Sequence, residues 1–371
     1  MTRYYRQADL EALRATVLTL EALRRRGVKN PRRNVVVILG HDFWNVLFGT
    51  ILAQVKPFTA AQMVQIRELA KQRGDGIAFG PGEPGLLEWR QLTKAKSPME
   101  FCTHFLLNVC PPTDNKPFFF DQRRLEDIGS EPATISPLTI HPMLILLLTL
   151  VMVVVLSMLF LAAPLILVRN AGRPPARDLS FFAAIGLGYM ILEIVLIQRF
   201  VLFLGFPTYA LSVVLFALLI FTGIGSLLSE RFALSRTALM VALASAFLMI
   251  GASAATLQPL LRHLILLSFP ARVGISVAII APMGVAMGMA MPAGLRRIKV
   301  LYGAGVPYAF GVNGIASVVG SVFAVAAAIN FGFAAVSIIA ALCYLAALVQ
   351  TALVSWPEEH AVKLGLDPVQ K

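Results

Sequence analysis

The chain has 371 residues, of which 57% are hydrophobic and 14% are charged, and its mean hydropathy is +0.76. This composition excludes an ordinary soluble enzyme and predicts a large membrane-embedded part. The formal net charge of +12 would suit a nucleic-acid-binding protein, but the basic residues gather in short loops between hydrophobic segments, which is typical of membrane proteins, so we expect no nucleic-acid partner.

The first 26 residues and the stretch after them carry the patterns of a small α/β fold. Leucine and valine recur on one face of residues 9–26, which predicts an amphipathic helix that ends at Gly27. "NVVVILG" (34–40) predicts a buried strand, and "GTILAQVKPF" (49–58) predicts a second strand. A further helix is expected over 59–74. Four such elements are too few for a complete doubly wound sheet.

Two local motifs refine this region. Thr59 and Gln62 have the spacing of a capping box, and Gly74 can end the helix that they begin. "GPGEPG" (80–85) matches the G-x-G-x-x-G pattern of phosphate loops. No clear strand leads into it, and its two prolines lack the N–H donors that phosphate binding uses, so we interpret it as a surface turn.

The cysteines and histidines do not indicate a metal site. Cys102, Cys110 and Cys343 have no metal-ligand spacing, and five scattered histidines make zinc improbable. An odd number of cysteines argues against a disulfide framework. The basic N-terminus is followed by no apolar core, so it does not read as a signal peptide.

"PPTDNKPFFF" (111–120) marks a change of structure. Prolines end what precedes it, and the Asp-Asn pair suits a turn. We interpret it as a junction between the first domain and the membrane, with direct substrate contact as the alternative. The candidate junction residues are Pro112, Asp114, Lys116, Phe118 and Phe119.

The rest of the chain predicts an all-α bundle of about seven transmembrane helices. A span needs about 20 apolar residues, and backbone groups in lipid must be satisfied within the helix. Seven segments qualify: 143–168, 180–204, 208–228, 237–257, 273–291, 308–329 and 333–354. In the fifth, Pro282 and Pro292 bound the stretch "PMGVAMGMAMP" (282–292), so we expect kinks or local unwinding at both ends of this stretch. The predicted domains are 1–122, a linker at 123–142, the bundle at 143–354 and a tail at 355–371.

Small residues within the spans indicate where helices pack closely. Gly284 and Gly288 form a GxxxG pair, and Ala316, Gly320 and Ala324 form a small-residue stripe. The sixth span also has one face of polar and small residues. This face could pack against a helix or line a substrate path, and both interpretations stay open.

Polar side chains inside the spans form a candidate intramembrane site. Glu193 lies about nine residues from the end of its span, where contact with lipid would cost several kcal/mol, so it should face the bundle interior. A polar pin between helices and a proton or ligand site are the two readings. The candidate residues are Tyr189, Glu193, Gln198, Arg199 and Asn313.

Stretches in both halves of the chain resemble a known family. "FFAAIGLGYMILEIVLIQRFVLFLGFPTYALSVVLFALLIFTGIGSLLSERF", "PMGVAMGMAMPAGLRR" and "VPYAFGVNGIASVVGSVFAVAAAINFGF" resemble the membrane region of the bacterial spermidine synthase-like multipass membrane proteins. "EALRRRGVKNPRRNVVVILG" and "CPPTDNKPFFFDQ" are similar to the last part of that family's Rossmann domain, of the type that binds S-adenosylmethionine. The resemblance covers nearly the whole chain.

The resemblance implies a fold and a function. The first domain would be the C-terminal remnant of a Rossmann-like fold, and the family's cofactor would be S-adenosylmethionine or its decarboxylated form. The family's glycine-rich turn and acidic catalytic loop have no counterpart here, so we expect no cofactor and no catalytic residues in this chain. The protein would be a multipass protein of the bacterial plasma membrane, with the lipid bilayer as its partner and possible association with a second chain that supplies the missing half.

Three functional hypotheses follow. The first is a member of that family without polyamine aminopropyltransferase or methyltransferase activity of its own. The second is a membrane carrier of a small amine or other metabolite, and the third is a structural subunit of a split membrane enzyme. The sidedness stays open, because the basic loops favour residues 1–141 outside the cell, whereas a domain that uses S-adenosylmethionine belongs in the cytosol. Those basic residues are Arg169, Arg173, Arg177, Arg231, Arg236, Arg296, Arg297 and Lys299.

Overall fold

The structure is a computed structural model that describes residues 2–4, 8–41, 47–85, 87–121, 142–162, 173–231, 235–354 and 356. Its contacts divide the chain into two units. The α/β unit comprises residues 1–113 and 117–139, and the helical unit comprises residues 114–116 and 140–371. Most of the predicted linker, the predicted tail except Trp356, and Arg169 lie outside the described residues.

The described residues of the α/β unit form four strands and several helices. In chain order they are β1 (Thr2–Tyr4), α1 (Ala8–Arg25), the 3-10 turn η1 (Pro31–Asn34), β2 (Val35–His41), β3 (Leu47–Ala53), α2 (Ala60–Arg73), β4 (Gly76–Phe79), α3 (Leu87–Lys94) and α4 (Pro98–His104). The sheet order is β1-β3-β2-β4, and each neighbouring pair is antiparallel. In the register of β2 and β3, Val35 pairs with Ala53 and His41 with Leu47.

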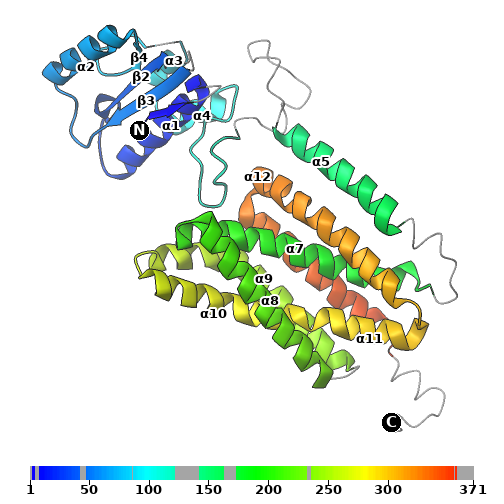
Figure 1. The fold of residues 1–371 in the computed structure, drawn as a ribbon. Coiled ribbons are helices and arrows are strands. Elements are labelled where there is room, and N and C mark those ends of the chain that lie inside the picture. Colours follow the sequence, from blue (N-terminus) through cyan, green and yellow to red (C-terminus); the bar gives the residue numbers. More distant parts are fainter. Residues whose placement is uncertain are drawn as a thin grey trace, which may run out of the picture. The chain divides into compact units, whose positions relative to one another are not determined.

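The core of this unit lies between α1 and the sheet (Figure 1). Leu13, Val17 and Leu20 are fully buried, because their spacing places them on one face of α1. They pack with alternate residues of β2, including Val35 and Val37. The neighbouring Val36 is buried as well, so β2 is covered on both faces. This explains why its sequence is a continuous apolar run.

The predicted elements around this core are confirmed, with shifted ends. The helix predicted at 59–74 is α2, and its capping box is complete: Thr59 and Gln62 bond each other's backbone N–H groups. Gly74 ends α2 in the left-handed conformation, with φ of 72°. The second predicted strand is shorter than expected, because β3 ends at Ala53.

Two predictions in this unit were wrong. A strand does lead into "GPGEPG", since β4 ends at Phe79, and α3 follows the turn. Strand β4 has only four residues, which are too few to show an alternating pattern, so the sequence did not predict this strand. The cysteines also form a disulfide, between Cys102 and Cys110. The chain turns back directly after α4 and brings their Cα atoms to 4.9 Å, an approach that a count of cysteines does not contain.

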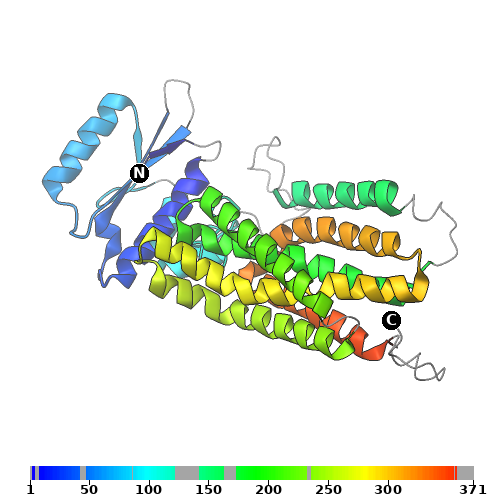
Figure 2. The ribbon, with the colours of Figure 1, turned by 60° about the horizontal axis from the view of Figure 1, so that its bottom comes forward.

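The helical unit follows. Its elements are α5 (Pro142–Ser157), the π-helical turn η3 (Met158–Ala162), α7 (Ala176–Leu204), α8 (Pro207–Arg231), α9 (Arg236–Leu264), α10 (Phe269–Gly288), α11 (Ala290–Tyr302) and α12 (Val306–Leu353). The helices lie roughly side by side in a bundle, with α7 between α8 and the two halves of α12 (Figures 1 and 2).

Five helical stretches of the described residues are long and apolar enough to cross a membrane. They are α7, α8, α9, the continuous pair α10 and α11, and α12. The 48-residue α12 is interrupted at Gly332, whose φ of 82° and ψ of 164° are not helical. There the chain reverses, and the two halves run in opposite directions (Figure 2). The sixth and seventh predicted spans are these halves, and the first is the shorter apolar helix of α5 and η3.

The fifth predicted span is only partly interrupted. α10 continues through Pro282, so the expected local unwinding does not occur at this proline. The helical hydrogen bonding is interrupted at Met289, between α10 and α11, although the φ of −72° and ψ of −27° of this residue stay helical. Pro292 explains the position of this interruption, because a proline cannot donate to the carbonyl four residues earlier, that of Gly288, and its ring crowds that carbonyl.

The fold class is therefore mixed, with a small α/β unit followed by a helical bundle. The described strand pairs are all antiparallel, whereas a Rossmann-like sheet is mostly parallel. The Rossmann origin of the α/β unit stays a prediction.

Candidate functional site

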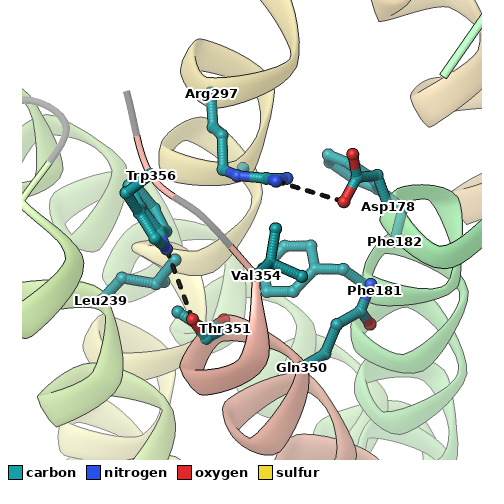
Figure 3. A pocket seen from close by; sticks show the side chains of 10 residues that line it. Asp178, Phe181, Phe182, Leu239, Arg297, Gln350, Thr351, Val354 and Trp356 are labelled. Atoms are coloured by element: carbon teal, nitrogen blue, oxygen red, sulfur yellow. Dashed lines mark hydrogen bonds and ion pairs between the residues drawn. The ribbon is translucent and has the colours of Figure 1, made fainter. Parts of the chain in front are cut away.

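A buried ion pair joins the start of α7 to α11 (Figure 3). The Asp178 carboxylate lies 3.2 Å from the Arg297 guanidinium, and the Tyr302 hydroxyl donates to its second oxygen at 2.5 Å. Asp178 is 3% exposed and lies in the first turn of α7, where the helix dipole favours an anion. Each oxygen of this carboxylate thus has a partner, which makes its burial tolerable.

The ion pair lines a small cavity of about 20 Å³, enough for one water molecule (Figure 3). Trp356 lies over the Arg297 guanidinium at 5.8 Å, and its indole N–H donates to the Thr351 carbonyl at 3.4 Å. Arg177 and Arg236 donate to the last carbonyls of α12, those of Leu353 and Ala352. Arginines therefore satisfy the carbonyl groups that the end of α12 leaves unpaired.

Of the predicted intramembrane site, Tyr189 and Glu193 are the two residues that lie next to each other in the structure. Both are partly buried on α7, one turn apart, and their side chains interact electrostatically. The Tyr189 hydroxyl also bonds Thr222 of α8. Within the described residues, no hydrogen bond or ion pair of Glu193 is found. A carboxylate without a fixed partner is free to respond to a proton or a cation.

Arg199 does not belong to that cluster. It is 3% exposed, and its guanidinium donates to the carbonyls of Ser253 at 2.8 Å and Ala254 at 3.4 Å, both on α9. Pro259 lies within α9 and cannot bond the carbonyl of Ala255, next to these two. The place of Arg199 near the end of its predicted span would let its long side chain carry the charge to the membrane interface. Instead, the guanidinium binds backbone carbonyls of α9 inside the bundle.

The other two candidate residues lie apart as well. Gln198 is exposed on α7. The Asn313 amide donates to the Phe182 carbonyl at 3.0 Å, and Gly186 leaves the space for it, since a Cβ there would lie 2.6 Å from the amide nitrogen. Of the five candidates, only Tyr189 and Glu193 thus lie together; Gln198, Arg199 and the Asn313 of α12 each lie in different surroundings.

The predicted small residues lie at close helix contacts. A Cβ at Gly284 would approach Phe221 to 2.8 Å, and one at Gly288 would overlap the Thr222 backbone, so α10 packs directly against α8. On α12, Gly320 lies against Leu187 of α7, Ala324 is fully buried and Ala316 is partly buried.

Two of the junction residues, Asp114 and Lys116, belong to the helical unit, together with Asn115 between them. Asn115 accepts from the N–H groups of Phe333 and Ala334, at 2.9 and 2.8 Å, where α12 reverses. A side chain at Gly332 would collide with it. Lys116 donates to the Asn330 carbonyl, and Asp114 forms an ion pair with Arg262 at 2.6 Å. The segment 114–116 thus satisfies backbone groups that the break in α12 leaves free.

The other junction residues, Pro112, Phe118 and Phe119, belong to the α/β unit. There the buried Arg14 of α1 donates to the carbonyls of Cys110, Phe118, Phe119 and Asp121 at 2.6–3.1 Å. Burial lowers the pKa of this guanidinium, and the charge of Asp121 raises it to a smaller extent.

Sequence reasoning missed the ion pair of Asp178 and Arg297, and it missed Asn115 as the partner of α12. One signal was available for the ion pair, since Asp178 is an acidic residue at the start of a long apolar helix. Its partner is 119 residues away, beyond the reach of any local pattern.

No family model, curated protein or solved structure matches this chain. Among the described residues, no three His, Cys, Asp or Glu side chains group closely enough to hold a metal ion.

Proposed function

We propose that this chain is an integral membrane protein of the spermidine synthase-like family whose helical unit has a structural role, without aminopropyltransferase or methyltransferase activity of its own. The structural role is supported by the partners of the buried polar groups of the helical unit. Arg199 and Asn313 donate to backbone carbonyls of neighbouring helices, at 2.8 and 3.0 Å. Groups engaged in this way hold helices together and are not free for a substrate.

The exposed surface of the helical unit supports insertion into a bilayer. Large apolar side chains are exposed along α5 and α8, and the basic side chains lie near helix ends. Lipid is the partner that such a surface fits, because it takes up apolar side chains without any specific contact. We place the protein in a bacterial plasma membrane on the sequence resemblance alone.

Calorimetry on the purified full chain tests the lack of transferase activity. We expect no binding of S-adenosylmethionine or of its decarboxylated form, because the residues that resemble the family lack its nucleoside-binding turn. Stoichiometric binding at micromolar concentration would overturn this part.

Extraction of membranes with alkaline carbonate tests the insertion, since an integral protein stays in the pellet. A second chain that co-purifies would favour the subunit of a split enzyme.

A second candidate function is a carrier of a small amine. The observation that favours it is Glu193, a partly buried carboxylate without a hydrogen bond among the described residues, beside Tyr189. Proteoliposomes should then take up labelled polyamine, and Glu193→Gln should abolish uptake while the melting temperature stays unchanged. Uptake no greater than that of empty vesicles would remove this candidate.

A further inference from the structure

The two ends of the helical unit differ in charge. We call one the basic end: α7 and α9 begin there, and α8, α11 and α12 finish there. At the other, the hairpin end, α7 and α9 finish and α12 reverses at Gly332. The described basic residues of the loops and helix ends at the basic end are Arg173, Arg177, Arg231, Arg236, Arg296, Arg297 and Lys299. The corresponding residues at the hairpin end are Lys116, Arg262 and Arg272.

This difference orients the bundle in a membrane. Cytoplasmic loops carry an excess of lysine and arginine, so the basic end faces the cytoplasm and the hairpin end faces outward. Arg199 does not enter the comparison, because it is buried within α7. The buried Arg297, which is paired with Asp178, can be left out for the same reason, and the basic end still carries six basic residues against three. The orientation rests on the proposed insertion into a bilayer.

The segment 114–116 lies at the hairpin end. Asp114 pairs with Arg262 at the last turn of α9, and Asn115 bonds the backbone after Gly332. Residues 113 and 117, which belong to the α/β unit, are covalently bonded to this segment. A folded unit cannot pass through the bilayer between adjacent residues, so the chain's connectivity assigns the α/β unit to the outward side.

The disulfide of the α/β unit is an independent observation that agrees with the outward location of this unit. Cys102 is fully buried in the core of the α/β unit, and Cys110 packs against that core. The carbonyl of Cys110 also accepts from the buried Arg14 at 2.9 Å. A buried disulfide between cysteines eight residues apart persists in an oxidising compartment, whereas the cytosol keeps thiols reduced.

We propose that the α/β unit lies outside the cytoplasm and that Cys102 and Cys110 are oxidised there to a structural disulfide. The bond forms by exchange with the disulfide of a thiol oxidoreductase. The S–S bond of the oxidoreductase breaks and is reduced to two thiols, while the two cysteine thiols lose two protons and two electrons and form the new S–S bond. On that side the unit is separated from cytosolic nucleoside cofactors by the membrane.

Labelling of the full chain in spheroplasts of a bacterial host tests the sidedness. Two variants in a Cys343→Ala background carry one added exposed cysteine each: Gln65→Cys on α2 and Glu230→Cys at the basic end. With a membrane-impermeant maleimide, we expect Gln65→Cys to react on intact spheroplasts and Glu230→Cys only after permeabilisation. The opposite pattern would overturn the sidedness. Reaction of both on intact cells would instead refute the proposed membrane insertion.

Alkylation without reduction, in the same background, tests the disulfide. Trypsin releases both cysteines in the single peptide 97–123, because Pro117 protects the bond after Lys116. Without prior reduction, we expect the peptide to carry no alkyl group and to weigh two hydrogens less than the dithiol form. After prior reduction, we expect it to carry two alkyl groups. Two alkyl groups without reduction would overturn the disulfide.

Discussion

The two units of this protein place their large apolar side chains differently. In the α/β unit, those of α1 and β2 are enclosed, as Leu13 and Val37 illustrate with 0% exposure. In the helical unit, Leu148 of α5 and Phe216 of α8 are 60% and 66% exposed. Water drives the first arrangement, whereas lipid accepts apolar surface without cost. The helical unit must therefore gain its stability from close packing and polar contacts.

The units nevertheless share one device, a buried arginine that donates to backbone carbonyls. Arg14 does so in the α/β unit and Arg199 in the helical unit. A guanidinium offers five donors and stays charged, so it can satisfy several carbonyls at once. Both units therefore depend on a polar contact of this kind, and four predictions test the comparison between the units.

The largest effect is expected at the buried ion pair of the helical unit. Asp178→Ala leaves the Arg297 charge without its carboxylate, so we expect a loss of about 3–5 kcal/mol, measured by thermal unfolding in detergent. Glu230→Ala, which removes an exposed acid at the same end, is the control and should have little effect. Equal melting temperatures for the two variants would show that the ion pair is not important for stability.

Close packing should come next. Gly288→Ala places a methyl group against the Thr222 backbone, so we expect α8 and α10 to separate at a cost of about 1–3 kcal/mol. Gly274→Ala is the matched control on the same helix, because nothing lies within 4 Å of its Cβ position. It should stabilise by about 0.5–1 kcal/mol. A shift of the same sign in both variants would contradict the role of packing.

The shared arginine device gives a third prediction. Arg14→Met and Arg199→Met each remove donors from buried carbonyls, at a cost of about 1–3 kcal/mol. Arg14 makes hydrogen bonds to four carbonyls and Arg199 to two, so the first variant should be the more damaging. Hydrogen exchange localises the effects, with faster exchange expected around residues 110–121 for Arg14→Met and around 253–258 for Arg199→Met. Unchanged exchange in these segments would refute it.

The smallest effect concerns Glu21 in the α/β unit. The hydrogen bond from Arg24 lowers the pKa of this carboxyl below its ordinary value of 4.5; desolvation opposes this, and Arg25 adds to it. Because the folded pKa is depressed, the stabilisation is present above about pH 4.5 and is lost as the pH falls below that. We expect about 0.5–1 kcal/mol.

Hydrogen exchange of α1 between pH 3.5 and 7 measures this dependence. Glu21→Gln should remove it, and Glu68→Gln, at an exposed position on α2, should leave it unchanged. A pH dependence that persists in Glu21→Gln would assign it to another group.

The sequence by itself determined the local features of this protein. The apolar segments, the buried face of α1 and the capping box of α2 follow from residues a few positions apart, because periodicity and capping act over one or two helical turns. Only the tertiary structure decided the Cys102–Cys110 bond, the partner of Asp178 and the contact of Asn115 with α12 after Gly332. Asn115 meets Ala334 across 219 residues, and such a contact exists only once the chain has folded. The candidate site divides for the same reason: the sequence places Glu193, Arg199 and Asn313 within apolar helices, but the packing of neighbouring helices decides which of them bind backbone.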